Sequence, residues 1–326
     1  MMSAHVRVVQ FTSDRSDAWD DLVERAPMAT FLHSRRFLSY HGDRFEDASV
    51  VLVDDDGRLR AALPAALDPS NPTTVISHPG ATYGGLIHDG SVNGDRALDA
   101  LAAALEHYAE HRLDVLRYKP VPHIYHRSPS GDDVWALGEL GAHRTGCDLS
   151  CAIDLVARRP PTERRERSLR RAREAGVVVN DDPALLAPLW PVVEEALERR
   201  HGVRPVHTLD EIDLLRSRFP DAIRPVAAQL EGSVIAGVVL FATAMVVHTQ
   251  YIAASERGMD VSALDAVIEH SIELAAAADA RYLDFGISPG EGRRGLLPGL
   301  YRWKAEFGGG GVIHEHYELR LDRQAA

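Results

Sequence analysis

Hydrophobic and polar residues in the first half of the chain follow two periods, one typical of strands and one typical of helices. In the helical segments apolar residues recur every three or four positions, as Trp19, Leu22 and Val23 do. The pattern predicts, in order, a strand (5–12), a helix (18–26), a hairpin that turns at 55–57 (48–67), a helix (94–112) and a strand (113–120). This half therefore predicts a mixed α+β lobe.

A break divides the chain near residue 155, where a strand-like segment runs into Pro160 and Pro161. A strongly charged helix follows, with Thr162 as its predicted N-cap and Gly176 as the residue that ends it. The rest predicts two helices (185–202, 208–219), three antiparallel strands (223–253), a helix (262–278), a strand (281–287), a short helix and a last strand (311–319). We therefore predict two lobes of ordinary domain size, residues 1–155 and 156–326.

Composition narrows the class of protein. The formal charge of −12 argues against a general nucleic-acid coat, because binding to phosphate chains needs clustered cations. No apolar run is long enough to span a membrane, and the first residues lack the pattern of a secretion signal. Two cysteines, Cys147 and Cys151, are too few for a disulfide framework. These features predict a cytoplasmic protein with reduced thiols.

Six stretches of sequence, together with the element order, resemble a known family. The order in the second half is similar to that of the GNAT acyltransferase fold. Two such lobes in tandem resemble the FemABX-like branch, which includes the bacterial tRNA-dependent aminoacyltransferases that build peptidoglycan cross-bridges. The stretches are 33–49, 77–86, 118–137, 248–253, 282–288 and 300–310. The resemblance implies an α+β fold of two tandem GNAT-like lobes, each a mixed, mostly antiparallel sheet flanked by helices, with the main catalytic site in the C-terminal lobe.

One departure from the GNAT pattern concerns the acyl donor. Acetyl-CoA-binding GNAT proteins carry an Arg/Gln-x-x-Gly-x-Gly/Ala loop, whose backbone N–H groups bind the pyrophosphate at a helix N-terminus. Here the matching segment, 254–267, holds Arg257 and Gly258 but lacks the glycine spacing. This weakens the case for coenzyme A and favours another acyl carrier, such as aminoacyl-tRNA.

Two residues are candidates for the chemistry of acyl transfer. The resemblance implies that Lys304, in a stretch that ends with Phe307 and a glycine run, binds the donor or stabilises the oxyanion. Asp284, at the end of an apolar strand, is a candidate to orient or deprotonate an amine. Each has a structural alternative. Lys304 can be a helix-edge lysine with its ammonium in water, and Asp284 can cap the turn that follows it.

Further polar and aromatic residues are candidates for substrate binding. One group is expected to line an acceptor groove between the lobes, where interlobe packing is the alternative. A second group, near Pro120 and Pro122, is expected to contact an anion or a sugar. The predicted substrate-binding residues are Arg36, Tyr40, His41, His78, Tyr83, Gly84, Lys119, His123, Tyr125, Gln250, Tyr251 and Phe307.

The charged helix after Thr162 is rich in arginine although the chain as a whole is acidic. Contact with a nucleic-acid backbone or a pyrophosphate is one interpretation, and a solvated face with glutamate partners is the other. We predict that Arg170 and Arg171, together with Arg257, bind the phosphates of the donor. No third ligand with suitable spacing accompanies His314 and His316, so no metal site is predicted.

The resemblance, together with these residues, implies an N-acyltransferase without a permanently bound cofactor. Its co-substrate would be aminoacyl-tRNA or acyl-CoA. Its partner would be a small-molecule amine acceptor: a metabolite, a nucleotide-sugar or a cell-envelope precursor. The acceptor end of a tRNA is a candidate second partner. The alternative is a non-catalytic ligand-binding protein with degenerate GNAT lobes, which the altered pyrophosphate loop favours.

Overall fold

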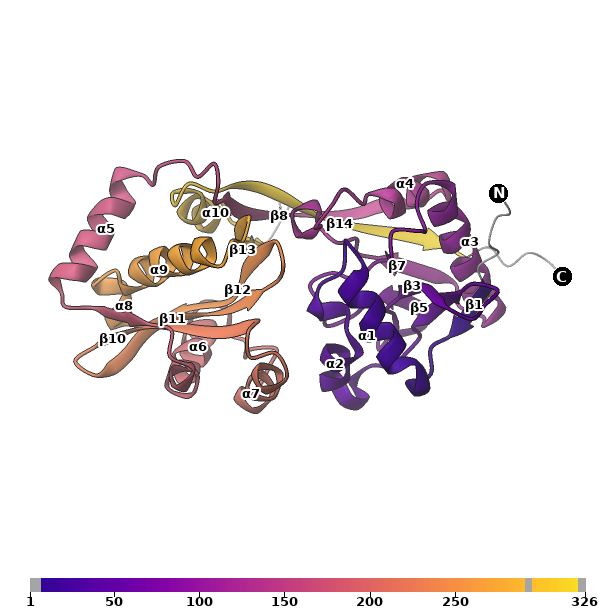
Figure 1. The fold of residues 1–326 in the computed structure, drawn as a ribbon. Coiled ribbons are helices and arrows are strands. Elements are labelled where there is room, and N and C mark those ends of the chain that lie inside the picture. The colour runs from indigo at the N-terminus through magenta and orange to yellow at the C-terminus, as the bar shows by residue number, and fades with distance from the viewer. Residues whose placement is uncertain (1–6, 291–294, 322–326) are drawn as a thin grey trace. The chain divides into compact units, whose positions relative to one another are not determined.

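The computed structural model describes residues 7–290 and 295–321. They form two compact units: one holds the described residues of Met1–Asp148 and Ile313–Ala326, and the other those of Leu149–Val312 (Figure 1). Two strands have residues in both units, β8 (His143–Asp154) and β14 (Gly310–Arg320). The last strand of the chain thus contributes most of its length to the first unit.

The first unit contains two groups of paired strands. An antiparallel sheet has the order β1-β2-β3-β6, and a second group has the order β4-β5-β7-β14. The strands are β1 (Arg7–Gln10), β2 (Val50–Val53), β3 (Leu59–Leu63), β4 (Ala66–Asp68), β5 (Asn71–Ser77), β6 (Ile87–His88) and β7 (Val115–Tyr118). The helices are α1 (Ser16–Arg25), α2 (Arg35–Leu38), α3 (Asp95–Glu110) and α4 (Asp132–Glu139). The predicted face of α1 is buried, with Trp19 and Leu22 inaccessible to solvent where α1 packs on β3 and β6.

The second unit is built on a sheet of order β8-β13-β12-β11-β10-β9. Its strands, besides β8, are β9 (Val178–Asn180), β10 (Ile223–Leu230), β11 (Ser233–Ala242), β12 (Val246–Ala254) and β13 (Tyr282–Ile287). Its helices are α5 (Glu163–Glu174), α6 (Leu186–His201), α7 (Leu209–Arg218), α8 (Glu256–Asp260), α9 (Ala263–Ala277) and α10 (Pro298–Ala305). Helices α6 and α9 cover opposite faces of the sheet: Gly237 of β11 lies against Leu189 of α6, and its neighbour Val238 belongs to the core beneath α9 (Figure 1).

Both units repeat one pattern of strands. In the first, β4 is antiparallel to β5, β5 is parallel to β7 and β7 is antiparallel to β14. In the second, β11, β12, β13 and β8 pair in the same sequence of directions. Helix α3 connects the parallel pair of the first unit and α9 connects that of the second. The repeat shows two lobes of one kind in tandem.

Most predicted elements are present, but strands β5, β6 and β9 were not predicted, and β8 was predicted only near its end. Strand β5 was missed because it begins with Asn71 and Pro72, which are unfavourable in strands. The first half of β8 was missed because it is polar and mostly exposed. Gly176 ends α5 with a positive φ of 79°, as predicted. Thr162 occupies the N-cap of α5 but makes no capping hydrogen bond with its side chain. The domain limits 1–155 and 156–326 stay a prediction, since the compact units divide at 148/149 and again at 312/313.

Candidate active site

The second unit contains a cavity of about 980 Å3 between its helices and the middle of its sheet. The lining residues are Arg164, Arg165, Arg167, Ser168, Arg171, Ala196, Leu197, Arg200, Thr249, Gln250, Ile252, Gly258, Met259, Ser262, Leu264, Asp265, Phe285, Leu297, Leu300, Trp303 and Lys304. The lining is therefore rich in guanidinium groups from α5 and α6, and Lys304 of α10 is the one other lysine or arginine among these described residues.

The sheet opens at this cavity. Strand β12 pairs in parallel with β13 only over Val246–His248 and Tyr282–Asp284, although β12 itself continues to Ala254. The register between β11 and β12 skips Gln250, which marks a bulge. Thr249 and Gln250 follow the last parallel pair and line the cavity. The divergence of the two strands thus leaves room for a ligand in the middle of the sheet.

Lys304 is buried at the edge of the cavity and is not a helix-edge lysine with its ammonium in water. The side chain is 3% exposed, and Nζ donates to the carbonyl oxygens of Gly286 (2.9 Å) and Ile287 (2.7 Å). These bonds use two of its three N–H groups. Burial lowers the pKa of Lys304 to about 8, while the nearby Asp284 carboxylate acts in the opposite direction. The ammonium is therefore still mainly cationic at pH 7.

The aromatic residues around Lys304 divide between core and cavity. Phe307 is inaccessible to solvent and packs against Phe285 and Trp303, with ring centroids 5.8 and 5.3 Å away. Trp303 and Phe285 line the cavity, whereas Phe307 lies behind them. The structure therefore places Phe307, predicted to bind substrate, in the supporting core.

Asp284 is also completely buried, with three donors on its carboxylate. Oδ1 accepts from the backbone N–H of Gly286 (3.0 Å) and from the hydroxyl of Ser150, and Oδ2 lies 3.0 Å from Nδ1 of His248. The bond from Gly286 is the turn-capping contact considered for this aspartate. The other two link three strands, β8, β12 and β13, in one polar cluster.

His248 and Ser150 are the residues of this cluster that sequence reasoning missed. His248 stands one residue before Thr249 in a stretch that was singled out, but its partner Asp284 lies 36 residues further along the chain. Only the register of β12 on β13, which pairs His248 with Asp284, brings them together. The available signal was that His248 is the first residue of the stretch 248–253, which the family resemblance includes.

The arginines differ in what they contact. Arg165 is 3% exposed and forms ion pairs with Asp265 and, at 3.1 Å, with Glu306. It therefore anchors α5 to α9 and α10. Arg171 is exposed and lines the cavity, and its contact with the donor stays a prediction. Arg170 is not among the lining residues, and Arg257 is held by Glu231 at 2.7 Å.

Gln250 and Tyr251 point to different surroundings. Gln250 lines the cavity, whereas Tyr251 is buried on the side of α6. The Tyr251 hydroxyl lies 2.6 Å from Nδ1 of His207, and its ring packs edge-on against Trp190. Of the two residues predicted to bind substrate on this strand, the structure brings Gln250 to the cavity.

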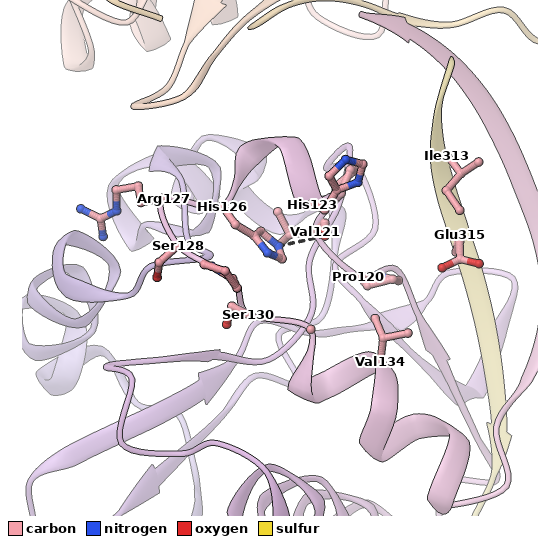
Figure 2. Close-up of a pocket in the computed structure, with 13 residues that line it drawn as sticks. Pro120, Val121, His123, His126, Arg127, Ser128, Ser130, Val134, Ile313 and Glu315 are labelled. Atoms are coloured by element: carbon pink, nitrogen blue, oxygen red, sulfur yellow. Dashed lines mark hydrogen bonds between the residues drawn. The ribbon is translucent and has the colours of Figure 1, made fainter. Parts of the chain in front are cut away.

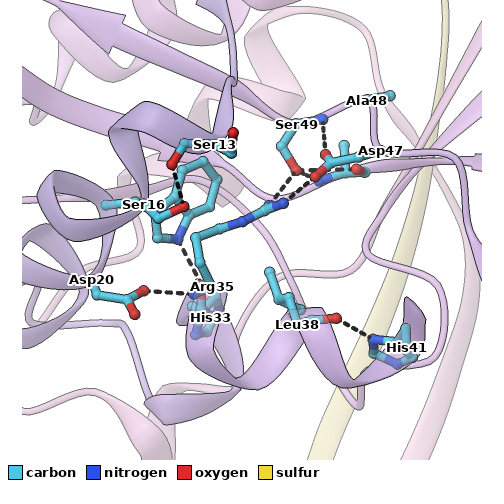
Figure 3. Close-up of polar contacts among 12 residues, drawn as sticks. Ser13, Ser16, Asp20, His33, Arg35, Leu38, His41, Asp47, Ala48 and Ser49 are labelled. Carbon is cyan, nitrogen blue, oxygen red and sulfur yellow. Dashed lines mark hydrogen bonds and ion pairs between the residues drawn. The ribbon is translucent and has the colours of Figure 1, made fainter. Parts of the chain in front are cut away.

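The first unit holds the remaining predicted residues, beginning with Arg36, Tyr40 and His41. Their segment is fixed by the neighbouring Arg35, whose guanidinium contacts Asp47 and Ser49 (Figure 3). The same guanidinium lies 3.8 Å from the centre of the Phe11 ring. The Arg36 side chain is exposed. His41 is buried, and its Nδ1 lies 3.0 Å from the carbonyl oxygen of Leu38 (Figure 3).

His78, Tyr83, Gly84 and Tyr125 are largely buried in the first unit. Burial lowers the pKa of His78 to about 3. The hydroxyl of Tyr83 donates to Thr30 at 3.1 Å, and its ring lies 4.8 Å from that of Tyr125. A Cβ on Gly84 would lie 2.1 Å from the carbonyl oxygen of Ser77, so glycine is required there. These contacts are those of a packed interior, and the predicted acceptor groove stays a prediction.

Lys119 resembles Lys304 in its surroundings. Its Nζ donates to the carbonyl oxygen of Ala81 at 2.7 Å, and burial lowers its pKa to about 8. The backbone of Lys119 also accepts from Gly84 and donates to the Ser77 hydroxyl. Lys119 and Lys304 are the only lysines in the sequence.

A separate cavity of about 580 Å3 lies within the first unit (Figure 2). It includes His123 among its lining residues, together with prolines, serines and His126, whose Nε2 lies 3.1 Å from the Val121 carbonyl oxygen. Arg127 also lines it, but its guanidinium donates to the backbone carbonyls of Glu24 and Ala26. His123 is thus the one predicted anion- or sugar-binding residue that the structure places in this cavity.

Within residues 7–290 and 295–321, no three His, Cys, Asp or Glu side chains lie close enough together to hold a metal ion. His316 of β14 instead contacts Asp148 at 3.0 Å. In the same ranges no helix is both long and apolar enough to cross a bilayer.

Comparison with known families decides what the second unit is. Residues 157–305 match the family model described as acetyltransferase (GNAT) domain. This range contains every residue that lines the larger cavity. Residues 157–305 are a GNAT domain. In the GNAT domain, the cavity thus lies at the opening between β12 and β13. No curated protein matches the sequence.

Solved structures extend the similarity to the whole chain. FemX shares 12% identity over 98% of each chain, with a TM-score of 0.71. L-PGS from Bacillus licheniformis shares 12% identity over 97% of this chain and 94% of its own (TM-score 0.62). A tandem GNAT protein from the clavulanic acid biosynthesis pathway shares 13% over 98% and 100% (TM-score 0.51). The predicted fold of two tandem GNAT-like lobes and the FemABX-like resemblance are confirmed at the level of fold.

Proposed function

We propose that the protein is an N-acyltransferase whose active site is the cavity of the GNAT domain. The observation that carries this proposal is the position of Lys304, a buried cation beside the opening between β12 and β13. A fixed ammonium in a water-poor site stabilises the negative charge that develops on a carbonyl oxygen during acyl transfer. The two backbone carbonyls that hold Nζ orient its remaining N–H group.

The donor is a molecule that carries phosphates at one end and an activated acyl group at the other. The arginines of α5 and α6 lie at the cavity, where guanidinium groups can pair with phosphate oxygens. Aminoacyl-tRNA and acyl-CoA both have this chemistry. The FemX-like fold supports the first, and the GNAT family model supports the second. Both donors occur in the cytoplasm, where we place the reaction.

The acceptor is a small molecule with a primary amine. Its neutral nitrogen attacks the acyl carbon, the carbonyl oxygen becomes an oxyanion beside Lys304, and collapse of this intermediate expels the carrier. His123, which lines the cavity of the first unit, is proposed to contribute to acceptor binding. In this reading the lobe over 156–326 holds the chemistry.

A transfer assay tests the proposal. The purified protein is incubated with a mixed amine pool and with radiolabelled aminoacyl-tRNAs in one arm or radiolabelled acetyl-CoA in the other. Lys304→Met is expected to lower the rate about 100- to 1000-fold, as removal of an oxyanion donor does. Arg302→Ala is the matched control, since Arg302 is exposed on the same helix and does not line the cavity.

The two arms separate the donors. Label that moves only from tRNA identifies an aminoacyltransferase, and label that moves only from acetyl-CoA identifies an acetyltransferase. No transfer in either arm contradicts catalysis. Thermal stabilisation by an acceptor amine alone would then support the second candidate, a ligand-binding protein, which the altered loop after β12 favours.

A further inference from the structure

The imidazole of His248 lies at the point where the sheet of the GNAT domain begins to open. His248 and Asp284 are the last cross-strand pair of the parallel ladder between β12 and β13, and beyond them the strands diverge. The residue after His248, Thr249, already lines the cavity. His248 itself is not among the lining residues, but Gly286 lies between its ring and Lys304, which does line the cavity.

Asp284 holds the ring of His248 in one orientation. Its Oδ2 lies 3.0 Å from Nδ1, and Ser150 and the Gly286 N–H contact the other carboxylate oxygen. With Nδ1 donating to the carboxylate, the lone pair of the neutral ring is on Nε2. The side chain of Asp284 is 0% exposed and that of His248 is 13% exposed. The histidine is thus the more accessible member of the pair, and the aspartate acts through it.

Gly286 connects this histidine to Lys304. Its N–H donates to Asp284, and its carbonyl oxygen accepts from Lys304 Nζ. Its φ is +72°, and a Cβ there would lie 3.0 Å from Cε1 of His248, the ring carbon between the two nitrogens. One glycine thus contacts the carboxylate, the imidazole and the ammonium. The opposite neighbour of His248 on β11 is the uncharged Phe241.

We propose that His248 is the proton acceptor of the reaction and that Asp284 is its positioning residue. The inference rests on the proposed acyl transfer and names the base for it. As the amine nitrogen forms its bond to the acyl carbon, one N–H proton passes to Nε2 of His248. The bond from the acyl carbon to the sulfur or oxygen of the carrier then breaks. The imidazolium returns the proton to that leaving atom, so the side chain ends neutral.

The test uses the donor and amine for which the wild-type protein shows transfer. His248→Asn keeps an amide nitrogen near the position of Nδ1, for Asp284 to accept from, and removes Nε2. We expect amide formation to fall about 100-fold or more in kcat, the usual contribution of a general base, with the KM for the donor little changed. His270→Gln on α9 is the matched control, since His270 contacts Glu273 away from the cluster.

Three further measurements separate a base from a structural residue. Added imidazole should restore part of the amide formation by His248→Ala, with the amide product counted rather than carrier release. Asp284→Asn should lower kcat and change the pH profile, because an amide can donate to Nδ1 and favour the other tautomer. Thermal unfolding of each variant reports whether it folds, and His248→Gln replaces His248→Asn if the latter does not.

The outcomes are distinguishable. A wild-type protein that transfers acyl groups, with His248→Asn as active as His270→Gln, overturns the role of His248 and leaves the proposed function in place. A folded but inactive His248→Ala that imidazole does not restore also counts against the proton acceptor. A wild-type protein inactive with both donors overturns the proposed function and this inference together.

Discussion

Lysine is rare in this chain, which has 34 arginines and two lysines among its 36 cationic side chains. Both lysines donate to backbone carbonyls and both have a pKa lowered to about 8 by burial. An ammonium is compact and changes its pKa readily when buried, whereas a guanidinium stays charged. Lysine at position 304 therefore combines a small point charge with a fixed direction, and this suits a single carbonyl oxygen.

The lowered pKa of Lys304 predicts how stability depends on pH. Between its folded value of about 8 and its ordinary value of 10.5, the unfolded chain binds more protons than the folded chain. Stability should therefore rise with pH through this window, by about 1.5 kcal/mol between pH 8 and pH 9.5 for this one group. Urea unfolding of wild type and Lys304→Met at these two pH values measures the difference. An equal pH dependence in both proteins would contradict the assignment.

At the scale of elements, helix α5 contributes both structure and charge. Arg165 is buried against Asp265 and Glu306, whereas Arg164, Arg167 and Arg171 line the cavity from exposed positions. The sequence predicts an arginine-rich helix but not which guanidiniums face a ligand. That depends on how α5 is rotated about its axis against α9, a contact between segments about 100 residues apart.

Arg171 should therefore matter for donor binding more than another arginine of the same helix. We expect Arg171→Ala to weaken binding of the donor about tenfold, because a charge-assisted hydrogen bond to phosphate is lost. Arg173→Ala, exposed but outside the cavity lining, should have little effect. Titration calorimetry at two salt concentrations compares them. Equal losses in the two variants would indicate only a general effect of charge.

Helix α7 begins with a local signal that the sequence shows plainly. The Thr208 hydroxyl accepts from the Glu211 N–H (3.2 Å), and the Glu211 carboxylate accepts from the Thr208 N–H (2.8 Å). Thr208→Ala should lower the free energy of unfolding by about 1 kcal/mol. Ser217→Ala, near the end of the same helix, is expected to change it by less than about 0.5 kcal/mol. Denaturant unfolding with an unchanged slope checks both values.

At the scale of the whole molecule, the two units have the same strand pattern but differ at the end of the parallel strand pair. In the second, β12 and β13 diverge beside the cavity. In the first, the parallel pair ends at Ser77 and Tyr118, and the next segment returns so that Gly84 N–H donates to the Lys119 carbonyl oxygen. The chain itself thus occupies the corresponding end of the first parallel pair.

This difference predicts one donor per chain although the fold has two GNAT-like lobes. Calorimetric titration with the donor identified by the transfer assay should give a stoichiometry of one, and Arg171→Ala should weaken that single site. Two sites of comparable affinity would show that the first unit also opens to a donor.

The sequence alone predicts the tandem α+β fold because local periods and turn residues mark most elements. The Glu231–Gly232 pair, for example, forms the turn that joins β10 and β11 within the predicted three-stranded segment 223–253. The site is less predictable, because it depends on register between distant strands. Ser150 and Asp284 are 134 residues apart, and His248 reaches Asp284 only through β12 pairing with β13. A buried residue such as Phe307 can likewise be predicted to bind substrate, because the sequence does not show which side chains pack against it.

The scarcity of lysine has a consequence for chemical self-damage. An activated acyl group reacts without a catalyst at any accessible neutral amine, and the side-chain amines of this chain are confined to two buried positions. Arginine supplies positive charge elsewhere without a nucleophilic nitrogen at neutral pH. A protein with the proposed function would thus present few side-chain amines that its own donor can modify.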